Sequence, residues 1–77
     1  MPHVILKMVE GRTEEQKRAL ADALTRAVTA TLGCSEDLVS VAIEDFKDEE
    51  WMARVFAPDI QQRSDTIYRM PGYGSEG

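Results

Sequence analysis

The feature that most constrains the fold is a long helical segment whose two ends are both marked in the sequence. Thr13 and Gln16 form a capping box, in which each side chain is placed to bond the backbone N–H of the other residue. Gly33 supplies the left-handed residue that commonly ends a helix. The apolar stripe of this segment consists of Leu20, Ala23, Leu24, Ala27, Val28, Thr31 and Leu32. We therefore expect one helix from the capping box to Leu32.

Apolar runs flank this helix on both sides. Residues 3–9 are apolar at both odd and even positions, which is typical of a strand buried on both faces. Residues 38–44 alternate with a period of two and place Val39, Val41 and Ile43 on one face. Strand, helix and strand in this order predict a βαβ unit with parallel strands and a right-handed crossover.

The C-terminal part predicts two short helices. The first is capped by Asp48 or a neighbour, and its apolar side consists of Trp51, Met52, Val55 and Phe56. Pro58 suits the first turn of the second helix, which stops at Pro71-Gly72. The tail after Tyr73 is expected to be loose. The predicted fold class is α+β, a β-α-β unit with additional C-terminal helices in a single domain over residues 1–77.

The length of the chain predicts self-association. At 77 residues, folding buries only about 60% of the surface that the unfolded chain exposes. Two strands alone do not make a stable sheet. We therefore expect a second copy to complete the sheet and the core.

Charge and residue counts exclude several kinds of partner. The net charge is −5 and no basic cluster occurs, so neither nucleic acid nor an anionic membrane is an expected partner. Cys34 is the single cysteine, which excludes an internal disulfide and fits a reducing compartment. With His3 as the single histidine, no cluster has metal-ligand spacing. We therefore expect no metal. No signal-like or membrane-spanning run is present, so we expect a cytoplasmic protein.

Pro2 stands directly before the first predicted strand. If Met1 is removed, the Pro2 nitrogen becomes a free secondary amine instead of an amide. Partial desolvation at the edge of a core disfavours the ammonium form and lowers the pKa of such an amine towards neutrality. A general base works best with a pKa near the working pH. Pro2 is therefore a candidate catalytic residue, although proline is also an ordinary first residue of a strand.

Two motifs at a fixed distance carry a resemblance to a known family. Pro2 opens a strand, and the block Glu10-Gly11-Arg12-Thr13-Glu14-Glu15-Gln16-Lys17 opens the long helix before a valine-rich second strand. Residues 2 to about 45 resemble 4-oxalocrotonate tautomerase and its superfamily. Trp51 and Pro71-Gly72-Tyr73 resemble the longer, dimer-forming branch. The resemblance implies a tautomerase-type fold and a homo-oligomer, most simply a homodimer.

The resemblance also implies an isomerase that interconverts the enol and keto forms of a 2-oxo acid without a cofactor. Pro2 takes the role of general acid/base, and Arg12 that of the carboxylate binder, since a guanidinium donates two parallel hydrogen bonds to a carboxylate. Where the prototype has a second arginine, this chain has Ser40. That loss of charge favours a monocarboxylate such as an aryl or alkyl enolpyruvate. Trp51 matches the family's apolar wall near the proline.

Other interpretations stay open at the level of the sequence. A hydratase or dehalogenase of an unsaturated or halogenated acid would use the same proline as an acid while a carboxylate activates water. Candidates for that carboxylate are Glu44, Asp45 and Glu50. Arg54 is a possible substitute for the lost cation, and Trp51 is equally well a core or interface residue. A non-catalytic small-molecule binder would share all the packing features.

Overall fold

A computed structural model of the chain describes residues 1–74, which divide into two compact units. The first comprises residues 1–47, and the second begins at Asp48. The expectation of one domain over residues 1–77 stays a prediction. The tail that was expected to be loose falls, from residue 75 onward, outside the described residues. Among residues 1–74, no helix is both long enough and apolar enough to span a membrane.

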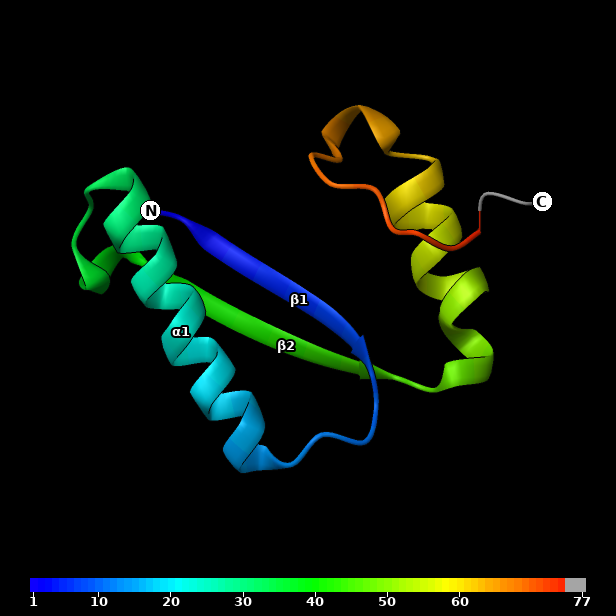
Figure 1. The fold of residues 1–77 in the computed structure, drawn as a ribbon, viewed down its shortest axis with the longest axis horizontal. Helices are drawn as coiled ribbons and strands as arrows, with labels where there is room; N and C mark the ends of the chain where they lie inside the picture. Colours follow the sequence, from blue (N-terminus) through cyan, green and yellow to red (C-terminus); the bar gives the residue numbers. More distant parts are fainter. Residues whose placement is uncertain (75–77) are drawn as a thin grey trace. The chain divides into compact units, whose positions relative to one another are not determined.

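The first unit is the predicted βαβ unit. Strand β1 (His3–Val9) and strand β2 (Ser40–Phe46) are parallel, with His3 opposite Ser40 and Val9 opposite Phe46. Helix α1 (Glu14–Leu32) returns the chain along one face of this sheet, as Figure 1 shows. The second strand begins two residues later than expected, because Leu38 belongs to a 3₁₀ turn, η1 (Glu36–Leu38), capped by the Ser35 hydroxyl.

The ends of α1 follow the sequence closely. The amide N–H of Gln16 donates to the Thr13 hydroxyl (3.1 Å), and the Thr13 N–H donates to the Gln16 side chain (3.0 Å), so the predicted capping box is present. Gly33 has φ 75°, in the left-handed region. Both ends are therefore confirmed as predicted.

The inner stripe of α1 differs in part from the predicted one. Leu20, Leu24 and Val28 are half-buried as expected, whereas Ala23 and Ala27 are exposed. The half-buried stripe instead includes Lys17, Ala21 and Thr25, which lie on the flank of the helix away from these alanines. Helical spacing alone does not fix which flank of an apolar stripe faces a sheet, because residues three and four apart both lie near its centre.

The two faces of the sheet are covered unequally. Met8 lies on the face that packs against α1, and it shares a pocket with Leu20 of that helix. Alternation puts Ile5 on the other face, where 54% of it remains exposed. The prediction that residues 3–9 are buried on both faces is therefore not met within one chain, because the unit has only one helix to cover its sheet.

The second unit is less regular than predicted. A 3₁₀ turn, η2 (Asp48–Glu50), precedes one π-helix, η3 (Met52–Gln61), and another 3₁₀ turn, η4 (Ser64–Thr66), follows. The prediction of a new helix at Pro58 was wrong, since Pro58 lies inside η3. Wider turns ease the clash between a proline ring and the carbonyl four residues earlier. The cap predicted near Asp48 was also wrong, because Trp51 occupies the N-cap without a side-chain hydrogen bond.

A small core lies within this second unit. Val55 and Phe56 are 3% and 5% exposed, and they are the only buried hydrophobic residues in the described part of the chain. The Tyr73 ring lies 5.5 Å from the Phe56 ring, and its hydroxyl accepts a hydrogen bond of 2.8 Å from the indole N–H of Trp51. Gly74 has φ 78°, and a Cβ atom there would lie 2.5 Å from Phe56 Cζ. The final described residues therefore pack onto the π-helix through an aromatic cluster.

Candidate functional site

The heads of the two strands bring Pro2, His3 and Ser40 together. The Ser40 backbone N–H donates to the Pro2 carbonyl at 3.1 Å, which extends the parallel ladder to the residue before β1. On the side-chain level, Ser40 Oγ lies 2.6 Å from His3 Nδ1. Two of these residues, Pro2 and Ser40, were singled out from the sequence, whereas His3 was not. The structure joins all three.

The chemistry available at Pro2 depends on its nitrogen. Pro2 is half-buried, while Met1 before it is 88% exposed and open to an aminopeptidase. Bonded to Met1, the nitrogen is an amide with no basic lone pair. In a chain that begins at Pro2, it is a secondary amine held at the head of a hydrogen-bonded strand, and it can accept and return a proton.

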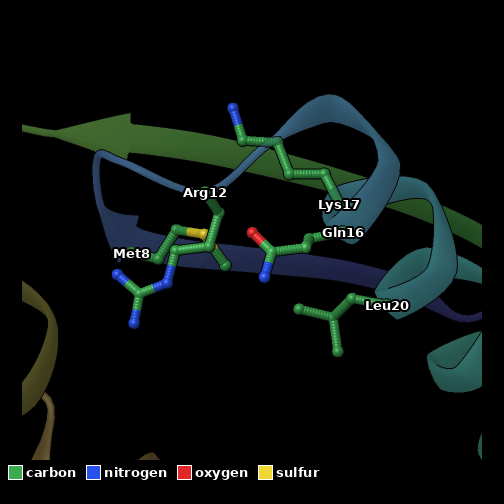
Figure 2. A pocket seen from close by; sticks show the side chains of 5 residues that line it. All are labelled: Met8, Arg12, Gln16, Lys17 and Leu20. Atoms are coloured by element: carbon green, nitrogen blue, oxygen red, sulfur yellow. The ribbon is translucent and has the colours of Figure 1, made fainter.

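A pocket of ≈ 230 Å³ lies at the other end of the unit, where β1 leads into α1. Figure 2 shows the side chains that line it, which are Met8, Arg12, Gln16, Lys17 and Leu20. Arg12 is exposed and donates one hydrogen bond of 3.2 Å to the Val9 carbonyl. Within the described residues no carboxylate pairs with Arg12. Its remaining guanidinium donors can therefore bind an anion in the pocket.

The second cation of the pocket, Lys17, is already engaged. Its ammonium bonds the Asp45 carboxylate closely, and Glu14 lies 3.5 Å away. The hydrogen bond that Lys17 donates to Asp45 raises the pKa of Lys17 above its ordinary value of 10.5, and the charges of both carboxylates act in the same direction. Lys17 therefore stays charged but neutralised, whereas Arg12 keeps guanidinium donors that an anion in the pocket can accept from.

Pro2 and Arg12 lie at opposite ends of β1. Strand geometry separates Pro2 from Met8, at the pocket, by about 20 Å, since each residue rises about 3.3 Å. Figure 1 shows the N-terminus and the start of α1 at opposite ends of the first unit. One small substrate cannot contact both groups of the same chain.

The remaining predicted residues have local partners. Trp51 belongs to the second unit, where it bonds Tyr73. Arg54, considered as a substitute cation, forms an ion pair of 3.3 Å with Glu50. Two of the three carboxylates considered for water activation, Asp45 and Glu50, are therefore held in ion pairs. In the part of the chain that the structure describes, no group of three His, Cys, Asp or Glu residues is arranged to hold a metal ion.

Sequence reasoning missed two contacts at this site. The His3–Ser40 contact depends on the register of the strands, and a second strand that starts at Leu38 gives a different register. The Lys17–Asp45 pair was missed because Lys17 was placed off the inner stripe of the helix. The signal that could have found it is the half-buried stripe at 17, 20, 21, 24, 25 and 28, which follows helical spacing equally well.

Comparisons with known proteins give a consistent picture. A family model described as tautomerase enzyme matches residues 2–56, which include Pro2, Arg12, Ser40 and Trp51. The chain is 42% identical over 74 residues to a probable tautomerase of Xylella fastidiosa, covering 96% of this chain and 90% of that protein. It is 36% identical over 74 residues to tautomerase PptA of Cronobacter sakazakii, covering 95% and 97%. A 2-hydroxymuconate tautomerase of Bacillus subtilis is 47% identical over 51 residues, covering 66% and 82%.

Proposed function

This chain belongs to the tautomerase family, that of 4-oxalocrotonate tautomerase, and is an isomerase, and we propose that it ketonises the enol form of a 2-oxo monocarboxylic acid with Pro2 as the acid/base group. The observation that carries this proposal is the family match that starts at Pro2 itself and includes Arg12. The exposure of Met1 supports its removal from the working protein.

The proposed reaction moves one proton away from oxygen and another onto carbon. The Pro2 amine takes the proton of the enol hydroxyl, and the electron pair of that O–H bond becomes the new C=O bond. The former C=C pair takes the proton from the prolinium nitrogen, which regenerates the amine. Atoms and electrons balance without a cofactor. The half-buried position of Pro2 favours the neutral amine that the first step needs.

Arg12 binds the substrate carboxylate in this proposal, but it comes from a second copy of the chain. About 20 Å of strand separates Pro2 from the Arg12 pocket of its own chain, so a shared substrate needs a partner. A two-fold dimer supplies each Pro2 with the other chain's Arg12, because the interface of such a dimer is reciprocal. The exposed Ile5 face of the sheet is consistent with such a partner.

The proposed substrate has one carboxylate. The name of the Bacillus subtilis relative points to 2-hydroxymuconate, which has carboxylates at both ends. At the position of the prototype's second arginine this chain offers only the Ser40 hydroxyl, which already contacts His3. Arg54 is paired with Glu50. An aryl or alkyl enolpyruvate, which has one carboxylate, therefore fits better.

The experiment is the rate of phenylenolpyruvate ketonisation by protein whose intact mass shows that Met1 is absent. We expect a rate well above background, and a loss of most of it in protein that retains Met1 or carries Pro2→Ala. Arg12→Ala should lower kcat/KM by about a hundred-fold, because it removes a charge-assisted bidentate contact. Arg18→Ala, which removes the same charge from an exposed position of α1, is the matched control and should keep full activity.

Two results would overturn the proposal. An unchanged rate in Pro2→Ala would eliminate the amine as the base. A rate at background in correctly processed oligomer would shift the function to a hydratase, a dehalogenase or a binder, and the same preparation would then be screened with unsaturated and halogenated acids.

A further inference from the structure

One residue of β2 holds both residues at the head of β1. The Ser40 main-chain N–H binds the Pro2 carbonyl at 3.1 Å, and its Oγ lies 2.6 Å from His3 Nδ1. The main-chain bond forms with any residue except proline at position 40. The side-chain bond needs a hydroxyl there and an acceptor or donor ring at position 3. The second attachment is therefore a property of this sequence and not of parallel sheets in general.

An attachment at this point has a mechanical consequence. The first residues of a chain are poorly ordered unless they are tied down. The ladder bond holds Pro2 through its carbonyl group. This bond alone still allows the pyrrolidine ring, with its nitrogen, to rotate relative to the sheet. The His3 side chain ties the adjacent residue to the same serine. A base that moves by about 1 Å loses much of its rate, so a second tie next to the amine is valuable.

We propose that Ser40 and His3 form a positioning pair that holds the Pro2 nitrogen in place for proton transfer. This inference rests on the proposed function of Pro2 as the base. In it, Ser40 acts on the reaction through its neighbours and does not bind the substrate, because its hydroxyl is already bound to the imidazole.

The His3–Ser40 hydrogen bond does not depend on the tautomer of the imidazole. A hydroxyl both donates and accepts, so it bonds either tautomer of the imidazole and also the protonated ring. The charged residues that share this face of the sheet are Lys7, four residues along β1, and Glu44, which lies opposite Lys7 in the register. The partner next to His3 is the neutral hydroxyl of Ser40. The pair is therefore expected to hold Pro2 with either tautomer of the His3 ring.

The first test replaces Ser40 in protein that lacks Met1, with phenylenolpyruvate as the substrate. Ser40→Ala removes the hydroxyl and keeps the ladder bond, so we expect kcat to fall about ten-fold while KM stays unchanged. Ser40→Thr restores the hydroxyl on a residue that suits strands, and it should recover kcat to within about two-fold. Ser64→Ala, which removes an exposed hydroxyl from the second unit, is the control and should match the wild type.

The second test asks whether the two residues act as one unit. His3→Ala should reproduce the loss in Ser40→Ala, and the double variant should be no slower than either single variant, because both changes break the same contact. His3→Asn keeps an acceptor close to the Nδ1 position and should recover part of kcat. The oligomer mass of each variant is measured alongside, so that a dissociated protein is recognised.

The outcomes separate this inference from the proposed function. If Pro2→Ala loses activity and Ser40→Ala does not, the amine is the base but the positioning pair is wrong. A rise in KM at constant kcat in Ser40→Ala would also overturn the pair and make Ser40 a substrate contact. Independent, multiplying losses in the double variant would contradict the shared contact.

Discussion

The two units differ in where regular structure and buried surface occur. The βαβ unit, residues 1–47, has a capped helix and an unbroken parallel ladder, yet none of its residues is fully buried. The second unit has short, irregular turns and a π-helix that contains a proline, yet it holds the two buried residues Val55 and Phe56. Regular backbone hydrogen bonding in one unit therefore does not by itself bury a core there. The unit that carries Pro2 and Arg12 is the one without a buried residue in a single chain.

The strongest way to test the contrast is to remove the core of the second unit. Phe56→Ala should lower the free energy of unfolding by about 3 kcal/mol or more, because it deletes a buried ring and leaves a cavity against Tyr73. Met52→Ala on the same helix, where the side chain is 49% exposed, should cost far less. Urea unfolding followed by the fluorescence of the single tryptophan, Trp51, measures both. Equal stability of the two variants would contradict a core at Phe56.

The incomplete face of the βαβ unit gives the next largest effect. Ile5→Asp should dissociate the oligomer, because burying a charge in place of an apolar residue that is now 54% exposed opposes a partner by about 2 kcal/mol or more. Ala23→Asp adds the same charge to an exposed position of α1 and serves as the control. Mass measured by sedimentation velocity distinguishes them. An unchanged mass for Ile5→Asp would mean that the partner covers another surface.

Two glycines near the C-terminus allow a test of how the last described residues pack onto Phe56. Gly74→Ala should destabilise by about 1–2 kcal/mol, because φ is 78° and the added Cβ would lie 2.5 Å from Phe56 Cζ. At Gly72 an added Cβ meets no atom within 4 Å, so Gly72→Ala should leave stability nearly unchanged. Thermal unfolding of both variants is the measurement. If Gly72→Ala proves the more damaging change, the packing of the last described residues onto Phe56 is refuted.

The smallest effect concerns the Lys17–Asp45 pair at the pocket. Asp45 raises the pKa of Lys17 above 10.5. The Lys17–Asp45 pair therefore stabilises the folded state fully below that pH. The effect is lost as the pH rises through the raised pKa of the folded state. Wild type should therefore exceed Asp45→Asn in stability at about pH 8, and the difference should shrink as the pH rises beyond 10.5. Glu49→Gln is the control for a carboxylate lost from an exposed site; a pH-independent difference for Asp45→Asn would exclude the ion pair as its cause.

Much of the first unit followed from the sequence because its signals are local. The capping box, Gly33 and the apolar runs act over a few residues, and they fixed α1 and β1 correctly. The start of β2 was missed because the Ser35 cap turns Leu38 into a 3₁₀ residue. The predicted helix start at Pro58 was wrong because a proline can lie inside a helix whose turns are widened, as in η3. The separation of Pro2 from Arg12 depends on the whole strand lying between them.

The most direct test of the account is to mix two inactive variants. Pro2→Ala and Arg12→Ala chains, each lacking Met1, are unfolded together, refolded at equal concentration and assayed with phenylenolpyruvate. If Pro2 of one chain works with Arg12 of its partner, a dimer should recover about a quarter of wild-type activity, since half of the pairs are mixed and each has one intact site. No recovery, with mixed oligomers verified by mass, would contradict a site completed by a second copy.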